Sequence, residues 1–417
     1  MERTRIAIVG CGGMGRRHLT GLAALQRSDF NNVELVAVCD LNVQNAEDLA
    51  DEAKESLGAR PRVFSKISDL VASMPEVAGV DVTTEAGSHH RVAIECLRSG
   101  LNVQIEKPLA ITIRGCNQIL QAARETGKVL SVAENYRRDP INRLARALID
   151  DGAIGAPQLM VETSIGGGNH IAITPWRHQK FTGTITLDAG VHNADILQYY
   201  LGEVDLAFGQ SHLFEKYRYN QASAGPGGFY AKWSSQFPER IEATGDDAMF
   251  SYLRFKNGAT GQWTYHHAAH GLSRRAREVF GSKGALTSPG DRNGRPLKLY
   301  FDGGREISDE GILDYAPSYR LSAVASQLFG GERVWTYSIP FVDTDAKILA
   351  SEYFEYGECI QKGQQPEVTG EVARRAIALV YAVSESGLAG RSVTLDEVES
   401  SAVDASQRDI DEHYHLV

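Results

Sequence analysis

The chain of 417 residues lacks several features that mark particular classes of protein. It has only five cysteines, an odd number scattered without C-x-x-C spacing, which argues against a disulfide framework and predicts reduced thiols and a cytoplasmic location. No apolar run approaches the ~20 residues of a membrane-spanning helix. The N-terminal stretch "MERTRIAIVGCGG" does not have the layout of a signal peptide, because its short apolar run leads straight into glycines.

The chain also lacks an excess of basic residues. Its formal net charge is −10, which argues against nucleic acid or an anionic membrane as the main partner. Internal repeats and low-complexity segments are absent from the sequence. With 42% hydrophobic and 23% charged residues, the composition is that of a soluble globular protein, and the length favours two domains over one.

The first third of the chain alternates between strand-like and helix-like segments. Short β-rich apolar runs predict strands, and amphipathic stretches between them predict helices. The expected strands are 5–10, 33–40, 79–84, 102–106 and 129–135, and the expected helices are 13–25, 42–56, 89–99 and 113–125. This alternation predicts a doubly wound parallel sheet of the Rossmann type over residues 1–135, with ligands bound at the carboxyl ends of its strands.

The pattern changes after about Tyr136. In residues 248–267, Asn257-Gly258 separates two strand-like runs, which is a strong hairpin signal. Further strands are expected at 158–164, 204–212 and 297–301, a helix at 371–387, and loops at 220–228 and 288–296. We therefore expect residues 136–417 to form a second, α+β domain with a large, mostly antiparallel open sheet.

A glycine-rich loop follows the first expected strand and opens the first expected helix. "GCGGMG" places Gly10, Gly12 and Gly15 in a G-x-G-x-x-G pattern, which permits a tight turn and brings backbone N–H groups to a pyrophosphate. Asp40 ends the second expected strand, where a carboxylate would accept hydrogen bonds from ribose hydroxyls and repel a 2′-phosphate. The alternative is a βα turn that is glycine-rich only for packing.

The acidic residue favours NAD over NADP as the cofactor. Arg16 and Arg17 weaken this preference, because an arginine could reach a phosphate, unless both are solvated or ion-paired on the first helix.

The stretch "NVQIEKPLA" places two opposite charges and a proline directly after a strand. A side chain at the end of a parallel strand is held rigidly, so Lys107 is well placed for chemistry. Glu106 can pair with a cation or orient Lys107, and Pro108 fixes the turn, with a cis peptide bond as one option. The alternative is a surface ion pair.

A second candidate segment is "DAGVHNAD". If it is helical, Asp188 and His192 lie at i and i+4 on one face, where a carboxylate and an imidazole form a proton-transfer pair. A capped helix with a structural histidine is the alternative reading.

Together these motifs resemble those of the Gfo/Idh/MocA oxidoreductases, which include glucose–fructose oxidoreductase and inositol dehydrogenase. The resemblance covers nearly the whole chain and rests on segments in family order: "IAIVGCGGMGRRHL", "SHHRVAIECLRSGLNVQIEKPLA", "ENYRRDP", "DGAIGAP", "PWR", "DAGVHNAD" and the closing stretch 366–393. The chain departs from the family pattern at Thr84-Glu85, where T-P is usual, and at Thr182-Gly183-Thr184, where G-G-G is usual. Both departures bear on the substrate more than on the fold.

The resemblance implies roles for individual residues. His192 would accept the proton of a substrate hydroxyl, Lys107 would hydrogen-bond that hydroxyl, and Asp188 would orient the substrate or His192. The implied cofactor contacts are Gly10, Gly12, Gly13, Met14, Gly15, Asp40, Thr84, His89, Glu106 and Lys107. The implied substrate contacts are Lys107, Arg137, Trp176, Arg177, His178, Asp188, His192, His266 and His267.

These residues predict an NAD-dependent dehydrogenase of a sugar, glycoside or cyclic polyol. A redox-neutral enzyme that retains its NAD, and a non-catalytic NAD-sensing regulator, are the alternatives. The spacing of His266, His267 and His270 does not match a zinc site, so no metal is expected. The resemblance also implies that residues 136–417 serve substrate binding and oligomerisation, and that the chain forms a homodimer or homotetramer.

Overall fold

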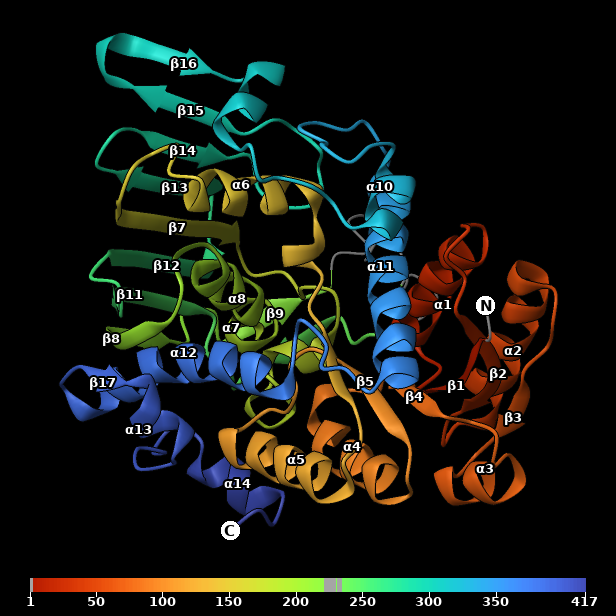
Figure 1. The fold of residues 1–417 in the computed structure, drawn as a ribbon. Coiled ribbons are helices and arrows are strands. Elements are labelled where there is room, and N and C mark those ends of the chain that lie inside the picture. The colour runs from red at the N-terminus through yellow and green to blue at the C-terminus, as the bar shows by residue number, and fades with distance from the viewer. Residues whose placement is uncertain (1–2, 221–229, 231–234) are drawn as a thin grey trace. The chain divides into compact units, whose positions relative to one another are not determined.

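The computed structural model describes residues 3–220, 230 and 235–417, and the chain falls into two compact units (Figure 1). Unit 1 comprises Met1–Asn135 and Val342–Arg374, and unit 2 comprises Tyr136–Phe341 and Arg375–Val417. The loop expected at 220–228 lies, apart from Asn220, outside the described residues. Within the described part of the chain, no helix combines the length and the apolar character needed to cross a membrane.

Unit 1 is built on a six-stranded parallel sheet in the order β3-β2-β1-β4-β5-β6, so the predicted Rossmann-type fold is confirmed. Its strands are β1 (Thr4–Val9), β2 (Val33–Cys39), β3 (Arg62–Phe64), β4 (Gly79–Val82), β5 (Asn102–Glu106) and β6 (Leu130–Ala133). Its helices are α1 (Gly13–Gln26), α2 (Val43–Leu57), α3 (Ile67–Ser73), α4 (His89–Arg98), α5 (Ile113–Thr126) and most of α11 (Phe341–Lys362). The short β3 and α3 were not predicted from the sequence.

Local signals explain where these helices begin and end. Asn42 caps α2 by accepting a hydrogen bond from the backbone N–H of Gln44, and Gly58 ends the helix in the left-handed conformation at φ 83°. Thr112 and Gly127 bound α5 in the same way. The central strands are buried on both faces, which is why their sequences read as continuous apolar runs.

Helix α11 packs on unit 1 although it is more than 200 residues away in sequence. Gly21 of α1 makes room for Leu349, and the fully buried Tyr356 donates a hydrogen bond to the carbonyl oxygen of Val80 at 3.1 Å. The sequence-based division placed residues 342–374 with the second domain. The sequence pattern could not show that residues 342–374 pack on the first domain, because these contacts join segments that are far apart in the chain.

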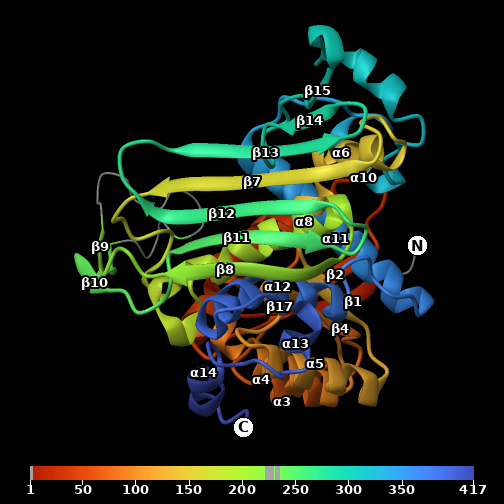
Figure 2. The same cartoon turned by 90° about the vertical axis from the view of Figure 1, so that its left-hand side faces the viewer.

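Unit 2 contains a nine-stranded sheet in the order β16-β15-β14-β13-β7-β12-β11-β8-β17 (Figure 2). Its strands are β7 (Pro157–Gly167), β8 (Val204–His212), β11 (Ala248–Phe255), β12 (Thr260–Ala269), β13 (Arg274–Gly281), β14 (Ala285–Ser288), β15 (Lys298–Phe301), β16 (Arg305–Ile307) and β17 (Val393–Thr394). Only β7 and β12 pair in parallel, so the mostly antiparallel sheet is confirmed. The expected hairpin forms, with β11 and β12 turning at Asn257-Gly258.

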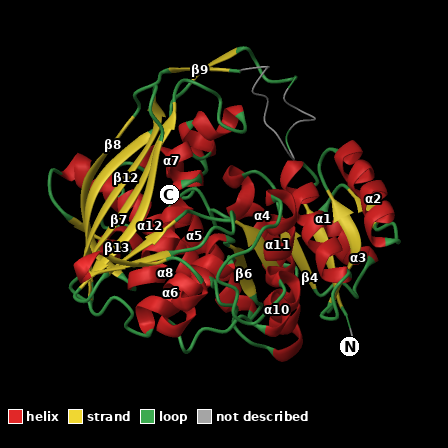
Figure 3. Cartoon of the chain, turned by 90° about the horizontal axis from the view of Figure 1, so that it is seen from above, coloured by secondary structure: helices red, strands yellow, loops and turns green. Residues whose placement is uncertain are grey.

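Helices pack on one side of this sheet, which Figure 3 shows edge-on as a single curved layer. The helices of unit 2 are α6 (Pro140–Asp150), α7 (Ile185–Asp188), α8 (Gly190–Leu201), α10 (Ala323–Phe329), α13 (Leu395–Glu399) and α14 (Arg408–His413), with α12 (Gly370–Ala389) continuing from unit 1. A short ribbon, β9 (Tyr217–Tyr219) with β10 (Arg240–Glu242), is separate from the sheet. Gly190 lies against Trp263, the largest fully buried side chain, so α8 covers the apolar face.

The buried Tyr356 gives a test of the packing of α11. Tyr356→Ala should lower the free energy of unfolding by about 3–5 kcal/mol, because it leaves a cavity against β4. Tyr356→Phe removes only the hydroxyl and should cost about 1 kcal/mol. Urea denaturation measures both values, and equally small losses would contradict the packing described.

Candidate functional site

The glycine loop joins β1 to α1 in a conformation that needs glycine at two positions for packing. Gly10 has φ +102°, and a Cβ there would lie 2.6 Å from the backbone nitrogen of Thr84. A Cβ on Gly15 would lie 2.4 Å from the carbonyl oxygen of Gly10. Gly12 is different, because a Cβ there would meet nothing within 4 Å. The space in front of Gly12 therefore admits a ligand that approaches the backbone.

The first turn of α1 offers hydrogen-bond donors toward this space. No side chain caps the helix at Gly12, and Gly13, Met14 and Gly15 form its first turn without an acidic residue. The N-terminal N–H groups and the positive end of the helix dipole are thus suited to a pyrophosphate.

Asp40 follows β2 and is tied to the loop. Its Oδ2 accepts the backbone N–H of Cys11 at 2.7 Å, and its Oδ1 accepts that of Asn42 at 2.8 Å. The carboxylate is half-buried and keeps further lone pairs for ribose hydroxyls. The open approach at Gly12, the helix terminus and this acid together fit a dinucleotide.

Both arginines of the first helix are ion-paired, as one of the two sequence-based alternatives expected. Arg16 pairs with Glu52 at 2.8 Å and with Asp48 at 3.5 Å, both on α2. Arg17 pairs with Asp345 and Glu106. Because each guanidinium already faces carboxylates, neither offers a surplus charge for a 2′-phosphate.

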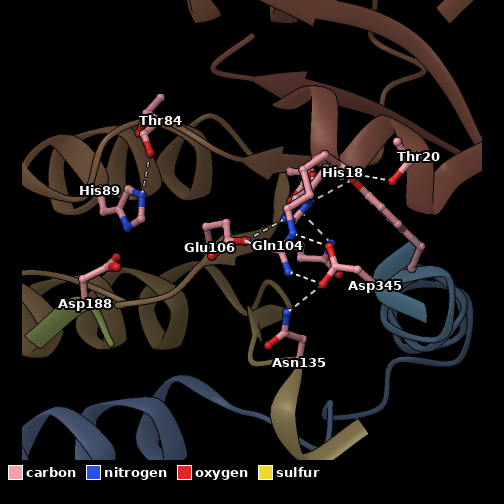
Figure 4. A network of polar contacts seen from close by, with 12 residues as sticks. His18, Thr20, Thr84, His89, Gln104, Glu106, Asn135, Asp188 and Asp345 are labelled. Carbon is pink, nitrogen blue, oxygen red and sulfur yellow. Dashed lines mark hydrogen bonds and ion pairs between the residues drawn. The ribbon is translucent and has the colours of Figure 1, made fainter. Parts of the chain in front are cut away.

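The ends of β4 and β5 are linked by His89. Its Nδ1 lies 2.8 Å from the carbonyl oxygen of Pro108. Its Nε2 lies 3.1 Å from the carbonyl oxygen of Thr84 (Figure 4). The ring is buried, and burial lowers the pKa of His89 despite these two carbonyls. The peptide bond between Lys107 and Pro108 is cis. His89 therefore holds the two strand ends together, while Lys107 is half-buried at the end of β5.

Glu106, the last residue of β5, belongs to a buried polar network that also contains His18 (Figure 4). His18 Nε2 lies 3.0 Å from Glu106 Oε1, and Arg17 Nη1 lies 3.2 Å from the same oxygen. Burial alone would raise the pKa of Glu106, but these two cations outweigh it and lower the pKa to about 2. Sequence reasoning missed His18, which reads as an ordinary histidine on a helix.

In unit 2, Asp188 ends α7 and His192 lies in the first turn of α8. The two helices are separated at Ala189, whose φ −92° and ψ −32° keep a helical sense. The expected single helix is therefore interrupted between the two residues. Thr184 caps α7 by accepting the N–H of Leu187 at 3.0 Å.

Arg177 is the partner of Asp188. Its Nε donates to Asp188 Oδ2 at 2.8 Å, and its Nη1 donates to Thr174 Oγ1 at 2.8 Å. The guanidinium lies 4.2 Å from the ring centroid of Trp176 and 5.3 Å from that of Tyr230. Burial would lower the pKa of Arg177, but Asp188 outweighs it and raises the pKa. Asp188 thus lies beside a permanent cation.

The imidazole of His192 stacks on Tyr136. The ring centroids are 4.1 Å apart and the planes differ by 4°. Arg292 contributes to the same group of side chains, since its guanidinium lies 4.9 Å from the Tyr136 ring centroid. This stacking fixes the plane of the His192 ring.

Arg137 is buried in an ion pair with Asp195. Its Nε lies 2.9 Å from Asp195 Oδ2, a second bond joins Nη2 to Oδ1, and the guanidinium lies 5.0 Å from the ring centroid of Tyr199. This bidentate pair connects the start of unit 2 to α8. The predicted substrate contact of Arg137 remains a prediction.

Three histidines predicted as substrate contacts have different surroundings. The Nε2 of His178 accepts the N–H of Ala172 at 2.8 Å, and burial together with Arg218 lowers the pKa of His178 to about 3. Burial and Arg218 likewise lower the pKa of His267 to about 4. His266 lies on β12 beside Phe214 and Phe250. In the part of the chain that the structure describes, no three His, Cys, Asp or Glu side chains are grouped to hold a metal ion.

Comparison with known families gives two matches that together cover most of the chain. Residues 4–134 match the oxidoreductase family with an NAD-binding Rossmann fold, and residues 142–287 match the GFO/IDH/MocA C-terminal domain. The chain belongs to the Gfo/Idh/MocA family. It is therefore an oxidoreductase-family protein with an NAD-binding domain.

Several named dehydrogenases are similar to this chain, two of them over nearly their whole length. Myo-inositol 2-dehydrogenase of Thermotoga maritima is 25% identical over 94% of this chain and 99% of its own. D-Apiose dehydrogenase of Paraburkholderia graminis is 25% identical over 96% and 92%. Levoglucosan dehydrogenase of Pseudarthrobacter phenanthrenivorans is 27% identical over 69% and 73%.

Solved structures share the fold of this Gfo/Idh/MocA chain. An NAD-binding oxidoreductase from Klebsiella pneumoniae has a TM-score of 0.72 and 24% identity, and covers 94% of this chain and 99% of its own. A levoglucosan dehydrogenase in complex with NADH and levoglucosan has a TM-score of 0.72 and 21% identity, and covers 94% and 100%.

The glycine loop yields a test that separates binding from packing. Gly12→Ala should raise the Kd for NAD on the order of tenfold or more and leave the melting temperature unchanged, because its Cβ points only toward the ligand space. Gly15→Ala should destabilise the fold by about 1–3 kcal/mol, because its Cβ meets backbone. Calorimetric titration and thermal denaturation measure the two effects. Unchanged NAD affinity in a folded Gly12→Ala variant would contradict this role of the loop.

Proposed function

We propose that this protein is an NAD-dependent dehydrogenase that transfers hydride between a secondary hydroxyl, or the corresponding ketone, of a neutral sugar, glycoside or cyclic polyol and the nicotinamide. One observation carries the proposal. The glycine loop follows β1, and Lys107 follows β5 of the same parallel sheet, so both lie at its carboxyl edge. A cation next to a dinucleotide site in this family is suited to hydroxyl oxidation.

The proposed chemistry assigns one role to each of three side chains. NAD supplies the hydride acceptor when it is bound. His192 accepts the hydroxyl proton on an imidazole nitrogen, and Lys107 donates a hydrogen bond to the oxygen as negative charge develops there. Asp188, held by Arg177, orients the substrate or His192. In the reverse direction, Lys107 and His192 polarise and protonate a ketone.

Charge pairing supports a neutral substrate. The two arginines among the expected substrate contacts are each paired with a carboxylate, Arg137 with Asp195 and Arg177 with Asp188. An acidic substrate needs positive charge beyond that of Lys107, and these two ion pairs do not supply it. The names of the relatives, which are myo-inositol, apiose and levoglucosan dehydrogenases, agree with a neutral polyhydroxylated substrate.

We also propose a cytoplasmic homodimer or homotetramer. All five cysteines are free and buried, in keeping with a reducing compartment. Phe208 and Tyr252 are register partners on one face of the large sheet and are 53% and 47% exposed. Phe280 and Tyr300 extend the same exposed face across β13 and β15. A second copy packed on this face would cover these aromatic side chains.

A substrate panel tests the function. With NAD, neutral compounds such as myo-inositol, levoglucosan, D-apiose and methyl glucosides should give NADH, followed by its absorbance, with higher kcat/KM than D-gluconate or D-glucuronate. Binding of a sugar with no released NADH would favour the redox-neutral alternative. Preference for the acids would overturn the neutral-substrate assignment.

Replacing Lys107 tests the mechanism. Lys107→Ala should lower kcat by a factor on the order of 10²–10³ while NAD affinity changes little, because the cation acts mainly on the transition state. His192→Ala should also slow turnover, most strongly near and below neutral pH, where hydroxide cannot replace the base. If folded Lys107→Ala protein has near-normal kcat, the lysine is structural and this mechanism is wrong.

A further inference from the structure

His18 is a fully buried histidine that the proposed mechanism does not use. It lies on α1 and has no solvent exposure, and its neighbours come from three other elements of unit 1. Glu106 of β5 lies 3.0 Å from Nε2 (Figure 4). Asp81 of β4 lies 2.7 Å from Nδ1, and the Tyr353 hydroxyl of α11 lies 3.3 Å from the same nitrogen.

The positions of Asp81 and Glu106 determine the protonation state of the His18 ring. A neutral imidazole has one N–H donor and one lone pair, and here each nitrogen faces a carboxylate oxygen. A lone pair directed at either carboxylate would be repelled, so both nitrogens carry a proton. Burial would lower the pKa of His18, but Asp81 and Glu106 outweigh it and raise the pKa to about 10.

The carboxylate of Glu106 is held by a second cation in addition to His18. Arg17, the neighbour of His18 on α1, donates from Nη1 to Glu106 and from Nε and Nη2 to Asp345 of α11 at 2.5 and 2.7 Å. Glu106 therefore has two cations on one oxygen, and its side chain is almost fully buried. A carboxylate held in this way is fixed in orientation.

We propose that His18 is a positioning residue for Lys107: its imidazolium holds Glu106 and thereby fixes the end of β5, where Lys107 begins. The inference rests on the function proposed above, in which Lys107 acts on the substrate oxygen. Small displacements of a catalytic group from its productive geometry cost rate. A histidine needed only for stability would not require a direct bond to the residue that precedes the lysine.

Two amide substitutions at His18 test the contributions of its two ring nitrogens separately. In His18→Gln the terminal amide reaches the position of Nε2 and can still donate to Glu106, whereas in His18→Asn the shorter amide reaches the position of Nδ1 and faces Asp81. Both changes remove the same charge. We expect His18→Asn to lower kcat on the order of tenfold to hundredfold. His18→Gln should retain more of the rate, with the Kd for NAD within about twofold of the wild type in both.

Two further variants serve as controls. Tyr353→Phe removes the hydrogen bond to Asp81 and the hydroxyl beside His18 Nδ1, but it keeps His18 and its contact with Glu106, so it should lower the melting temperature and leave kcat unchanged. In a Lys107→Ala background, His18→Asn should have little further effect on kcat, because the group that it positions is absent. All rates are measured with NAD and the panel compound that is oxidised fastest.

The results distinguish a failure of this inference from a failure of the role proposed for Lys107. Equal loss in His18→Asn and His18→Gln, or an undiminished effect of His18→Asn without Lys107, would overturn this inference alone. A folded Lys107→Ala variant with normal kcat would overturn the proposed role of Lys107 and, with it, the inference, whereas a failure of the substrate panel to give NADH would overturn the proposed function.

The charge of His18 can be measured without activity. In ¹⁵N-histidine-labelled wild-type protein, the resonance absent from the His18→Gln spectrum should show a doubly protonated ring at pH 8, well above the ordinary pKa of 6.5. Glu106→Gln removes one of the two anions and should lower the pH at which that ring titrates. A neutral His18 at pH 8 in the wild type would refute the imidazolium and the inference.

Discussion

Charge buried at one edge of the first sheet imposes the constraint on which the rest of unit 1 depends. An isolated ion in an apolar interior costs several kcal/mol, so each buried charge needs a partner with good geometry. His18 and Arg17 supply the positive charges, and Asp81, Glu106 and Asp345 supply the negative ones. Since Asp345 lies on α11, the chain must return to unit 1 to complete the set. The long-range packing of α11 follows from electrostatics as well as from apolar contact.

The same rule explains the arginines of unit 2. Arg277 is fully buried and meets Glu162 at 2.7 Å and Asp291 at a similar distance. Arg137 pairs with Asp195 and Arg177 pairs with Asp188, and each guanidinium lies near an aromatic ring, that of Tyr199 and that of Trp176 respectively. Pairing holds the side chains of Asp195 and Asp188 in place. It also offsets the positive charge of these two arginines, which supports the proposal of a hydroxyl-rich, uncharged substrate.

Sequence patterns predicted the first sheet well because its signals are local. The strand, the glycine loop and the capped helix are each specified within about 25 residues, as at Asn42 with Gly58. His18 could not be found in this way, because Asp81, Glu106 and Tyr353 lie 63, 88 and 335 residues away. The division into α7 and α8 at Ala189 was also not predicted, since an i, i+4 spacing reads the same in one helix or in two consecutive ones. The functional roles of Lys107, Asp188 and His192 remain predictions.

At the two places where the chain departs from the family pattern, side-chain hydrogen bonds support the local backbone. At the first, Glu85 accepts the N–H of Gly87 at 2.9 Å and so caps the short turn after β4. At the second, Gly183 alone adopts a positive φ of 102°, while Thr184 caps α7. In both places a side-chain hydrogen bond now supports the local geometry. The local backbone at both positions is therefore held by contacts within the chain itself. A fold depends on its hydrogen-bonded backbone and specificity on side chains, so we expect these two departures to bear on the substrate more than on the fold.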